Sequence, residues 1–207
     1  MENNFIVSDI DKYLQINDIS GEDLAKIWKQ VKTDYASYEK WICYHNYSEI
    51  PFKLLEEIGA VLEDDCIETR LAKGGFSYSE ASGVVRITVD NFDEFAALHH
   101  KRNPEMVKSE RIRRNFSRWG IFALLMDSRV TDYIILATGH PVEAEIFCVE
   151  ASDSDKCKKL ISYAAKYAFD SGKEEVLYMA DEDTMAHKAA ISVGFANTGF
   201  YKGYGVR

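Results

Sequence analysis

The sequence has no apolar run that approaches the length of a membrane-spanning helix, and its start does not resemble a secretory signal. A transmembrane helix needs about 20 consecutive apolar residues, and a signal peptide needs a basic segment before its apolar one. We therefore expect a cytoplasmic protein that has no membrane partner.

Metal-ligand spacing is also absent from the four cysteines of the chain. Structural zinc sites combine closely spaced pairs of cysteines or histidines. Cys43 and Cys148 instead lie inside apolar strand patterns, where a thiol behaves as a small apolar side chain. We expect reduced structural thiols and no metal. The four thiols belong to Cys43, Cys66, Cys148 and Cys157.

Positive charge is scarce, because 34 acidic residues face 25 lysines and arginines and leave a net charge of −9. Nucleic-acid binding depends on neutralising phosphates, so this balance argues against a nucleic-acid partner. One stretch runs against it. That stretch is either a solvated helix face or part of a pocket for an anionic ligand, such as the phosphates of a nucleotide-derived cofactor. It contains His99, His100, Lys101, Arg102, Lys108, Arg111, Arg113, Arg114 and Arg118.

A pattern near the N-terminus returns in the same order near the C-terminus. An apolar strand, an amphipathic helix, a second strand and a second helix ending at a glycine occupy residues 13–59 and again residues 146–194. The second strand and the glycine are 18 residues apart in both copies, from Trp41 to Gly59 and from Val176 to Gly194. The pattern predicts a strand, helix, strand, helix unit that is present twice.

A different block lies between the two copies. It predicts a strand at 84–89, helices at about 92–102 and 106–118, and a hairpin around Asp127-Ser128-Arg129. Asn91 is placed to cap the first of these helices. A strand at 142–149 opens the second copy, and a final pair of strands is expected around Asn197-Thr198-Gly199.

This order of elements resembles the GNAT acetyltransferase superfamily. The most similar segment is the helix at 186–193 that ends in Gly194-Phe195, where a left-handed glycine cap lets the phenylalanine fold back onto the core. The resemblance implies an α/β fold with a mixed α+β sheet. It places a GNAT-like domain at 83–207 and a half-GNAT repeat at 1–75.

The resemblance also implies acetyl-CoA as co-substrate, lying against Phe147 and Val149 of the fourth GNAT strand and against Asp155 and Lys156 at the next helix start. Only residues without side chains let a diphosphate approach the backbone closely. The turn at 149–158 contains no glycine, and its aspartates can satisfy the helix amides themselves. We expect a helix start that is already capped, by Asp153, Ser154 or Asp155.

Two residues are candidate catalytic groups. Glu145 alternates onto one side of its strand with Glu143, Phe147 and Val149, and it matches the general base of some GNAT enzymes. Many relatives carry a tyrosine four residues before the Gly-Phe pair, but this chain has Ala190 there. Tyr201, or Tyr204, is the candidate that returns a proton to the leaving thiolate.

The histidines have simpler interpretations. His187 is expected to be a solvated helix residue, and His140 a turn residue. His99 and His100 lie at a helix end, where they complement the helix dipole.

The sequence therefore favours an N-acyltransferase that moves an acetyl or other acyl group from a CoA thioester to a small amine. The alternative is an inactive GNAT-derived binding or regulatory protein, which the capped turn and Ala190 favour. The N-terminal repeat either packs on the full domain or mediates a homodimer. Acceptor and acyl group are not specified by the sequence.

Overall fold

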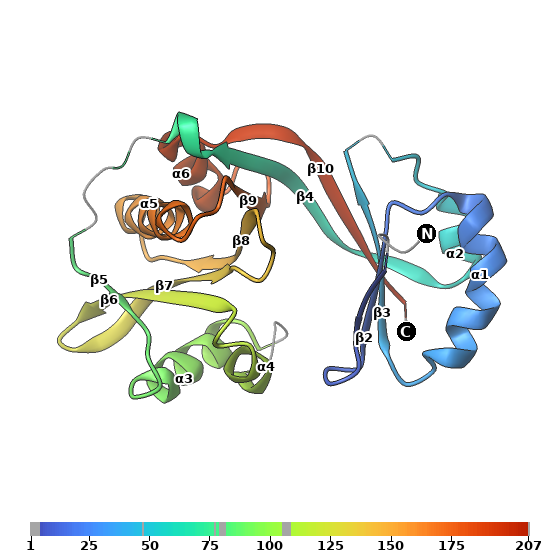
Figure 1. The fold of residues 1–207 in the computed structure, drawn as a ribbon, viewed down its shortest axis with the longest axis horizontal. Helices are drawn as coiled ribbons and strands as arrows, with labels where there is room; N and C mark the ends of the chain where they lie inside the picture. The colour runs from blue at the N-terminus through green and yellow to red at the C-terminus, as the bar shows by residue number, and fades with distance from the viewer. Residues whose placement is uncertain (1–4, 47, 77, 79–81, 105–108, 207) are drawn as a thin grey trace. The chain divides into compact units, whose positions relative to one another are not determined.

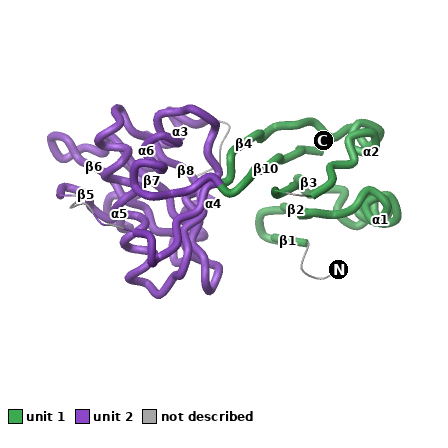
Figure 2. The backbone as a smooth tube through the Cα atoms, turned by 90° about the horizontal axis from the view of Figure 1, so that it is seen from above, with its two compact units in different colours: residues 1–68, 198–207 green, residues 69–197 purple. Residues whose placement is uncertain are grey.

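The structure is a computed structural model that describes residues 5–46, 48–76, 78, 82–104 and 109–206. One mixed sheet of ten strands has the order β1-β2-β3-β10-β4-β9-β8-β7-β6-β5. The chain forms two compact units, with residues 1–68 and 198–207 in unit 1 and residues 69–197 in unit 2 (Figure 2). Two long strands, β4 (Ala60–Ala72) and β10 (Ala196–Val206), contribute residues to both units.

Unit 1 is a small sheet with two helices. Parallel strands β2 and β3 are connected by α1, β1 pairs with β2, and β10 pairs with β3 in the antiparallel sense. Both helices pack on one side of β2 and β3 (Figure 1), where Leu14, Ile42 and Tyr204 meet Leu24 and Trp28. The elements are β1 (Phe5–Ser8), β2 (Tyr13–Asn17), α1 (Gly21–Asp34), β3 (Glu39–His45) and α2 (Phe52–Glu57).

Unit 2 packs helices on both faces of its strands. Helices α5 and α6 cover one face through a core that includes Leu160, Ile146 and Val193, and α3 and α4 contribute to a second core with Phe95 and Ile112. The elements are η2 (Lys73–Gly75), β5 (Val84–Arg86), α3 (Phe92–Arg102), α4 (Ser109–Arg114), β6 (Trp119–Met126), β7 (Arg129–Ala137), β8 (Glu143–Glu150), α5 (Ser154–Asp170), β9 (Glu175–Ala180) and α6 (Met185–Val193).

Several sequence predictions are confirmed. The strand, helix, strand, helix order is present both at β2-α1-β3-α2 and at β8-α5-β9-α6. Asp127 and Ser128 turn the β6–β7 hairpin with φ of 50° and 64°. Gly194 caps α6 with φ of 113°, and Phe195 is only 3% exposed. All four cysteines carry thiols rather than disulfides in the structure.

Other predictions need correction. The expected pair of strands near residue 198 is one continuous strand, β10. The Asn46 side chain lies against Gly199 and accepts a hydrogen bond from the Phe200 N–H, which keeps this segment extended. Helix α4 ends at Arg114, since residues 115–118 form turns. Asn91 does not cap α3 with its side chain, which instead accepts from the Thr88 N–H at 2.7 Å.

The predicted division at 1–75 and 83–207 remains a prediction. In the structure, residues 198–207 group with unit 1, because β10 pairs with β3 from Tyr201 opposite His45 to Val206 opposite Lys40. None of the described helices combines the length and the apolar composition needed to cross a membrane.

Candidate functional site

The parallel strands β8 and β9 are paired at one end and separate at the other. Their ladder runs from Glu143 opposite Glu175 to Ile146 opposite Tyr178. Both strands are described along their whole length, and beyond this point residues 148–150 pair only with β7. Backbone groups at the end of β8 therefore face an opening, which is the kind of place where an extended ligand can add its own hydrogen bonds.

A β-bulge lies at the beginning of this opening. Ile135 of β7 pairs with Cys148 and Leu136 pairs with Ile146, so Phe147 is the extra residue of β8. The bulge reverses the alternation of side chains. Phe147 packs with Trp119 in the core next to α3, whereas Val149 packs in the core under α5. The prediction that Val149 shares a side with Phe147 and Glu145 is therefore wrong.

Arg70 of β4 holds the paired end of the two strands together. Its guanidinium lies 3.0 Å from a carboxylate oxygen of Glu143 and 2.5 Å from one of Glu175. These two acids are also the first pair of the β8–β9 ladder, so without Arg70 they would repel each other. Glu143, which the sequence allowed as an alternative base, is thus engaged in an ion pair.

Glu145 occupies the middle of the paired segment, opposite Leu177 of β9 and Ala137 of β7. Burial, with the nearby charge of Glu143, raises the pKa of the Glu145 carboxyl to about 7. A carboxylate with a pKa near neutrality is suited to accept a proton in acid–base chemistry. This residue is therefore chemically competent for the role predicted from the sequence, which no contact in the structure tests.

The start of α5 lies immediately after β8 and is capped as predicted. The Asp153 side chain accepts a hydrogen bond from the Lys156 N–H at 2.9 Å. Asp155 is exposed in the first turn. The amides of residues 153–155 have no acceptor among the described residues, so three N–H groups of this helix start remain open.

A buried aspartate, which the sequence did not suggest, supports this turn. Asp132 of β7 is fully buried and accepts from the Ser152 N–H at 2.6 Å. Lys156 lies 3.3 Å from Asp132 and donates to the Ser152 hydroxyl at 2.7 Å. Burial alone would raise the pKa of Asp132, but hydrogen bonds from Thr131, Ser152 and Lys156 outweigh it and lower that pKa.

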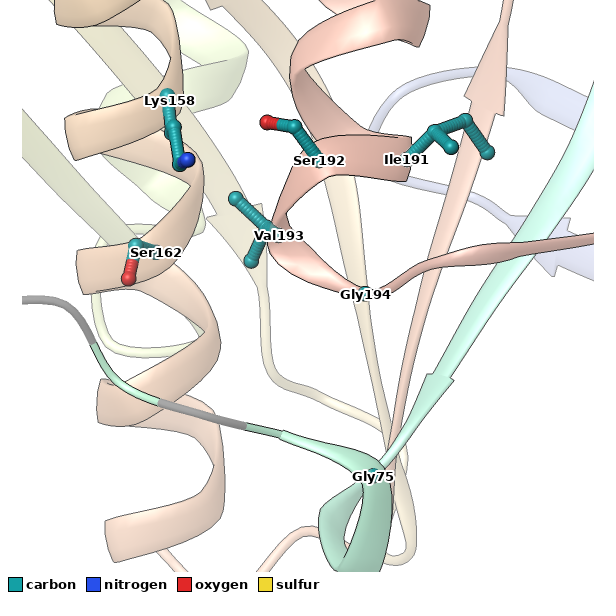
Figure 3. Close-up of a pocket in the computed structure, with 7 residues that line it drawn as sticks. All are labelled: Gly75, Lys158, Ser162, Ile191, Ser192, Val193 and Gly194. Carbon is teal, nitrogen blue, oxygen red and sulfur yellow. The ribbon is translucent and has the colours of Figure 1, made fainter.

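A surface cavity of about 370 Å³ lies between the flanks of α5 and α6 (Figure 3). Its polar groups come from Lys158, Ser162 and Ser192. The Ser162 hydroxyl is buried and has no hydrogen-bond partner among the described residues. Lys158 follows the open amides at residues 153–155 by about one helical turn, or about 5 Å. The lining residues are Gly75, Lys158, Ser162, Ile191, Ser192, Val193 and Gly194.

Tyr201, the second predicted catalytic residue, belongs to unit 1. Its hydroxyl lies 3.1 Å from the Cys43 sulfur, and its ring centroid is 5.2 Å from that of His45. Burial, together with Cys43, raises the pKa of Tyr201, so the phenol keeps its proton at neutral pH. Glu145 lies in unit 2, and a joint role for the two residues stays a prediction.

The basic stretch is not one uniform face. His99 lies in the last turn of α3, as predicted, but it is buried with its Nδ1 2.8 Å from the Tyr133 hydroxyl, so it is not part of a solvated helix face. The Arg113 guanidinium pairs with Asp93 and lies over the ring of Phe92 at 4.4 Å. Lys108 falls outside the described residues.

Two other histidines also make specific contacts. His187 is 7% exposed rather than solvated; its Nδ1 accepts from the Asp183 N–H and its Nε2 lies 2.9 Å from the Asn197 side-chain oxygen. His140 is a turn residue, as predicted, and accepts from the Glu143 N–H at 3.1 Å. Within the described ranges, no group of three His, Cys, Asp or Glu residues could hold a metal ion.

Comparison with known proteins gives a match in structure but not in sequence. No known family model and no curated protein matches the sequence. A GCN5-related N-acetyltransferase from Kribbella flavida has a similar structure, with a TM-score of 0.70, 12% identity, and coverage of 98% of this chain and 85% of that protein.

Two further structures are also similar to this chain. A tandem GNAT protein from the clavulanic acid biosynthesis pathway gives a TM-score of 0.58 at 10% identity, covering 97% of this chain and 77% of that one. N-myristoyltransferase from Saccharomyces cerevisiae with bound myristoyl-CoA gives 0.64 at 9% identity, covering 94% of this chain and 58% of that one. The chain therefore has the acyl-CoA N-acyltransferase fold shared by GNAT proteins and N-myristoyltransferase.

Proposed function

We propose that this protein is an acyl-CoA-dependent N-acyltransferase that acts on a small amine. The observation that carries the proposal is the opening between β8 and β9, which begins one residue after Ile146 and lies next to Glu145. Fold alone does not fix an activity. The opening, a carboxyl group with a pKa of about 7 and a helix start with open amides are what support it here.

The residues present fit a CoA thioester. The backbone at residues 147–150, which has no partner in β9, can pair with the amides of a pantetheine arm, and the amides of residues 153–155 can donate to a diphosphate. Lys158 and the Ser162 hydroxyl would hold the nucleotide end in the cavity beside α5. When bound, such a ligand supplies a thioester carbonyl that is activated toward an amine.

Glu145 would act on the acceptor. In its ionised form it accepts a proton from the substrate ammonium, which makes the amine nucleophilic. The amine nitrogen then forms an amide bond to the acyl carbon, the carbon–sulfur bond breaks with its electron pair on the sulfur, and the second proton of the nitrogen replaces the one that Tyr201 gives to that sulfur. Tyr201, which keeps its proton at neutral pH, is the proposed donor of a proton to the leaving thiolate.

The acidic turn opposes diphosphate binding and makes the proposal testable. A carboxylate about 4 Å from a phosphate charge is repelled by about 1 kcal/mol in water and about 4 kcal/mol in a partly screened site. Asp153→Ser keeps a capping oxygen but removes the charge, and Asp155→Ser removes the second charge. The double variant should bind acetyl-CoA at least fivefold more tightly than the unchanged protein in calorimetry.

Acetyl-pantetheine, which lacks the diphosphate, is the control ligand. The double variant should bind it as tightly as the unchanged protein does. Lys158→Ala should weaken acetyl-CoA binding several-fold and leave acetyl-pantetheine binding unaltered. If none of these proteins binds acetyl-CoA and a panel of amines releases no free thiol, the alternative of an inactive GNAT-derived binding protein is the one that remains.

The two segments of like element order, β2-α1-β3-α2 and β8-α5-β9-α6, support a further part of the proposal. We interpret the first as a half-GNAT repeat of the second, with Gly59 (φ of 75°) and Gly194 in corresponding positions. Sedimentation of the full chain tests whether this repeat pairs two chains. A monomer at all concentrations would argue against a homodimer.

A further inference from the structure

The sheet of unit 1 has two faces of different composition. The even-numbered residues of β2 and β3, such as Leu14, Ile16 and Ile42, point to the side on which α1 and α2 pack. Alternation along the strands puts the odd-numbered residues on the other face. We call this second face the aromatic–acidic face. Its strand residues are Tyr13, Gln15, Asn17, Glu39, Trp41, Cys43, His45 and Tyr201.

The aromatic rings on this face are held in place by specific contacts. The Tyr13 hydroxyl donates to Gln15 at 2.6 Å, and the Trp41 indole N–H donates to Glu39 at 2.7 Å. Gly203, which lies opposite Cys43 in the β3–β10 ladder, leaves room for the Trp41 ring, because a Cβ there would be 3.2 Å from it. The rings are thus positioned by the sheet, as a binding platform requires.

Carboxylates surround these rings. Glu39 holds the Trp41 indole, and Asp18 accepts from the His45 N–H at 2.7 Å at the opposite end of β3. The side chains of Asp64 and Glu63 lie beside the positions of Gly203 and Gly205.

The described lysines of the same strands, Lys40 and Lys202, have even numbers, and Lys202 pairs with Asp65 at 2.5 Å. The aromatic–acidic face is therefore rich in negative charge and in π-electron density.

We propose that the aromatic–acidic face of unit 1 binds a small organic cation that carries a primary ammonium group. The faces of tryptophan and tyrosine rings attract ammonium groups by about 0.5–2 kcal/mol, and neighbouring carboxylates add Coulomb attraction. A strand face in solvent usually carries polar residues such as lysine, threonine and glutamate, whereas this face carries half-buried tryptophan and tyrosine rings. The site needs only residues of unit 1, among them Tyr201, the proposed proton donor, and binding of the cation itself requires no acyl transfer.

The test uses 1,4-diaminobutane as the probe and the three indole N–H resonances of the ¹⁵N-labelled full chain as the readout. The Trp41 resonance, assigned by its loss in Trp41→Phe, should shift in a saturable way. Trp28, which is 8% exposed in the α1 core, and Trp119 of unit 2 should shift by less than a third as much. 1,4-Butanediol has the same length without the charge and should produce no saturable shift.

A matched pair of variants separates specific binding from general attraction to an acidic protein. Glu39→Gln should weaken diaminobutane binding at least fivefold, because it removes the carboxylate nearest Trp41. Glu22→Gln, on the outer surface of α1 with a side chain that is 81% exposed, should leave the affinity unchanged. Equal shifts at all three tryptophans, equal responses to diamine and diol, or equal affinities of the two variants would each overturn the proposal.

Discussion

The Asp132 carboxylate in strand β7 accepts a hydrogen bond from the backbone N–H of Ser152 at 2.6 Å, and Lys156 lies 3.3 Å from its other oxygen. A buried acid from one strand thereby fixes the turn that leads from the next strand into α5. Its side chain occupies one of the backbone donors in this turn, so any anionic ligand must use the donors that follow.

Asp132→Ala should destabilise unit 2 by about 2–3 kcal/mol, because it leaves the Ser152 amide without its acceptor and removes the buried partner of Lys156. Asp132→Asn should lose less, since it retains an oxygen for the Ser152 N–H. Urea denaturation measures both. Asp170→Ala removes the acid of an exposed i,i+4 pair with Lys166, and it should cost under about 1 kcal/mol. An Asp132→Ala cost equal to that of this control would show that the buried contact contributes nothing.

The raised pKa of Glu145 predicts how the acyl-transfer rate depends on pH. The rate should rise as the pH increases through about 7, because the proton acceptor is the ionised form. Glu143→Gln removes one of the two causes of the raised pKa, so the midpoint should move to lower pH. In Glu145→Gln the midpoint should disappear along with most of the rate. A midpoint near 7 that survives in Glu145→Gln would assign the titration to another group.

The same carboxyl makes folding stability depend on pH. The folded state binds the Glu145 proton more tightly than the unfolded state, so its stabilising effect is complete below the ordinary glutamate pKa of 4.5 and is lost as the pH rises through about 7. When the pH is raised from 4.5 to 8, the free energy of unfolding of Glu145→Gln should therefore rise by about 1–3 kcal/mol relative to that of the unchanged protein. Urea midpoints at both pH values test this, and a difference that does not vary with pH would contradict the assigned pKa.

Arg70 should be more important for stability than its partial exposure suggests. Arg70→Met keeps the apolar part of the side chain but leaves Glu143 and Glu175 facing each other across the first pair of the β8–β9 ladder. We expect a loss of about 1–2 kcal/mol, and addition of Glu175→Gln should recover part of it because the repulsion is removed. Additive effects of the two substitutions would show that Arg70 does not act on this pair.

Gly199 marks the point at which β10 continues through the predicted break. A Cβ at Gly199 would lie 1.4 Å from the side-chain oxygen of Asn46, which accepts from the Phe200 N–H. Gly199→Ala should displace Asn46 and cost about 1–2 kcal/mol through the lost hydrogen bond. Gly74→Ala, where a Cβ has open space, is the control and should be close to neutral in thermal unfolding. Equal melting temperatures for the two variants would show that Asn46 can move without cost.

Local sequence patterns were sufficient for most of the elements. Apolar alternation and capping residues located β3, α5, β9 and α6 to within a few residues, and Gly194 marked the end of α6 because only a left-handed cap fits there. The long strand β10 was missed because Asn197, Thr198 and Gly199 have the chemistry of a turn. Their extended conformation depends on Asn46, which is far away in sequence.

Parts of the candidate site could be predicted from the sequence only where they depend on a single strand and not on the pairing between strands. Glu145 follows from alternation along β8, but the side of Val149 does not, because the bulge at Phe147 is visible only in the pairing with β7. The role of Asp132 was missed, although its position gave a signal. A carboxylate among the apolar residues of a strand indicates that it is buried with a hydrogen-bonding or charged partner. Its partners, Ser152 and Lys156, become identifiable only when the strands are placed side by side.

The division of the chain also bears on how the protein is made. Asn46 and Phe200 are 154 positions apart and bond to each other within unit 1. A ribosome therefore finishes all of unit 2 before it supplies the last strand of the unit it began with. The early segment has to wait with an unfilled strand position, so unit 1 can complete its fold only after residues 198–206 have been made.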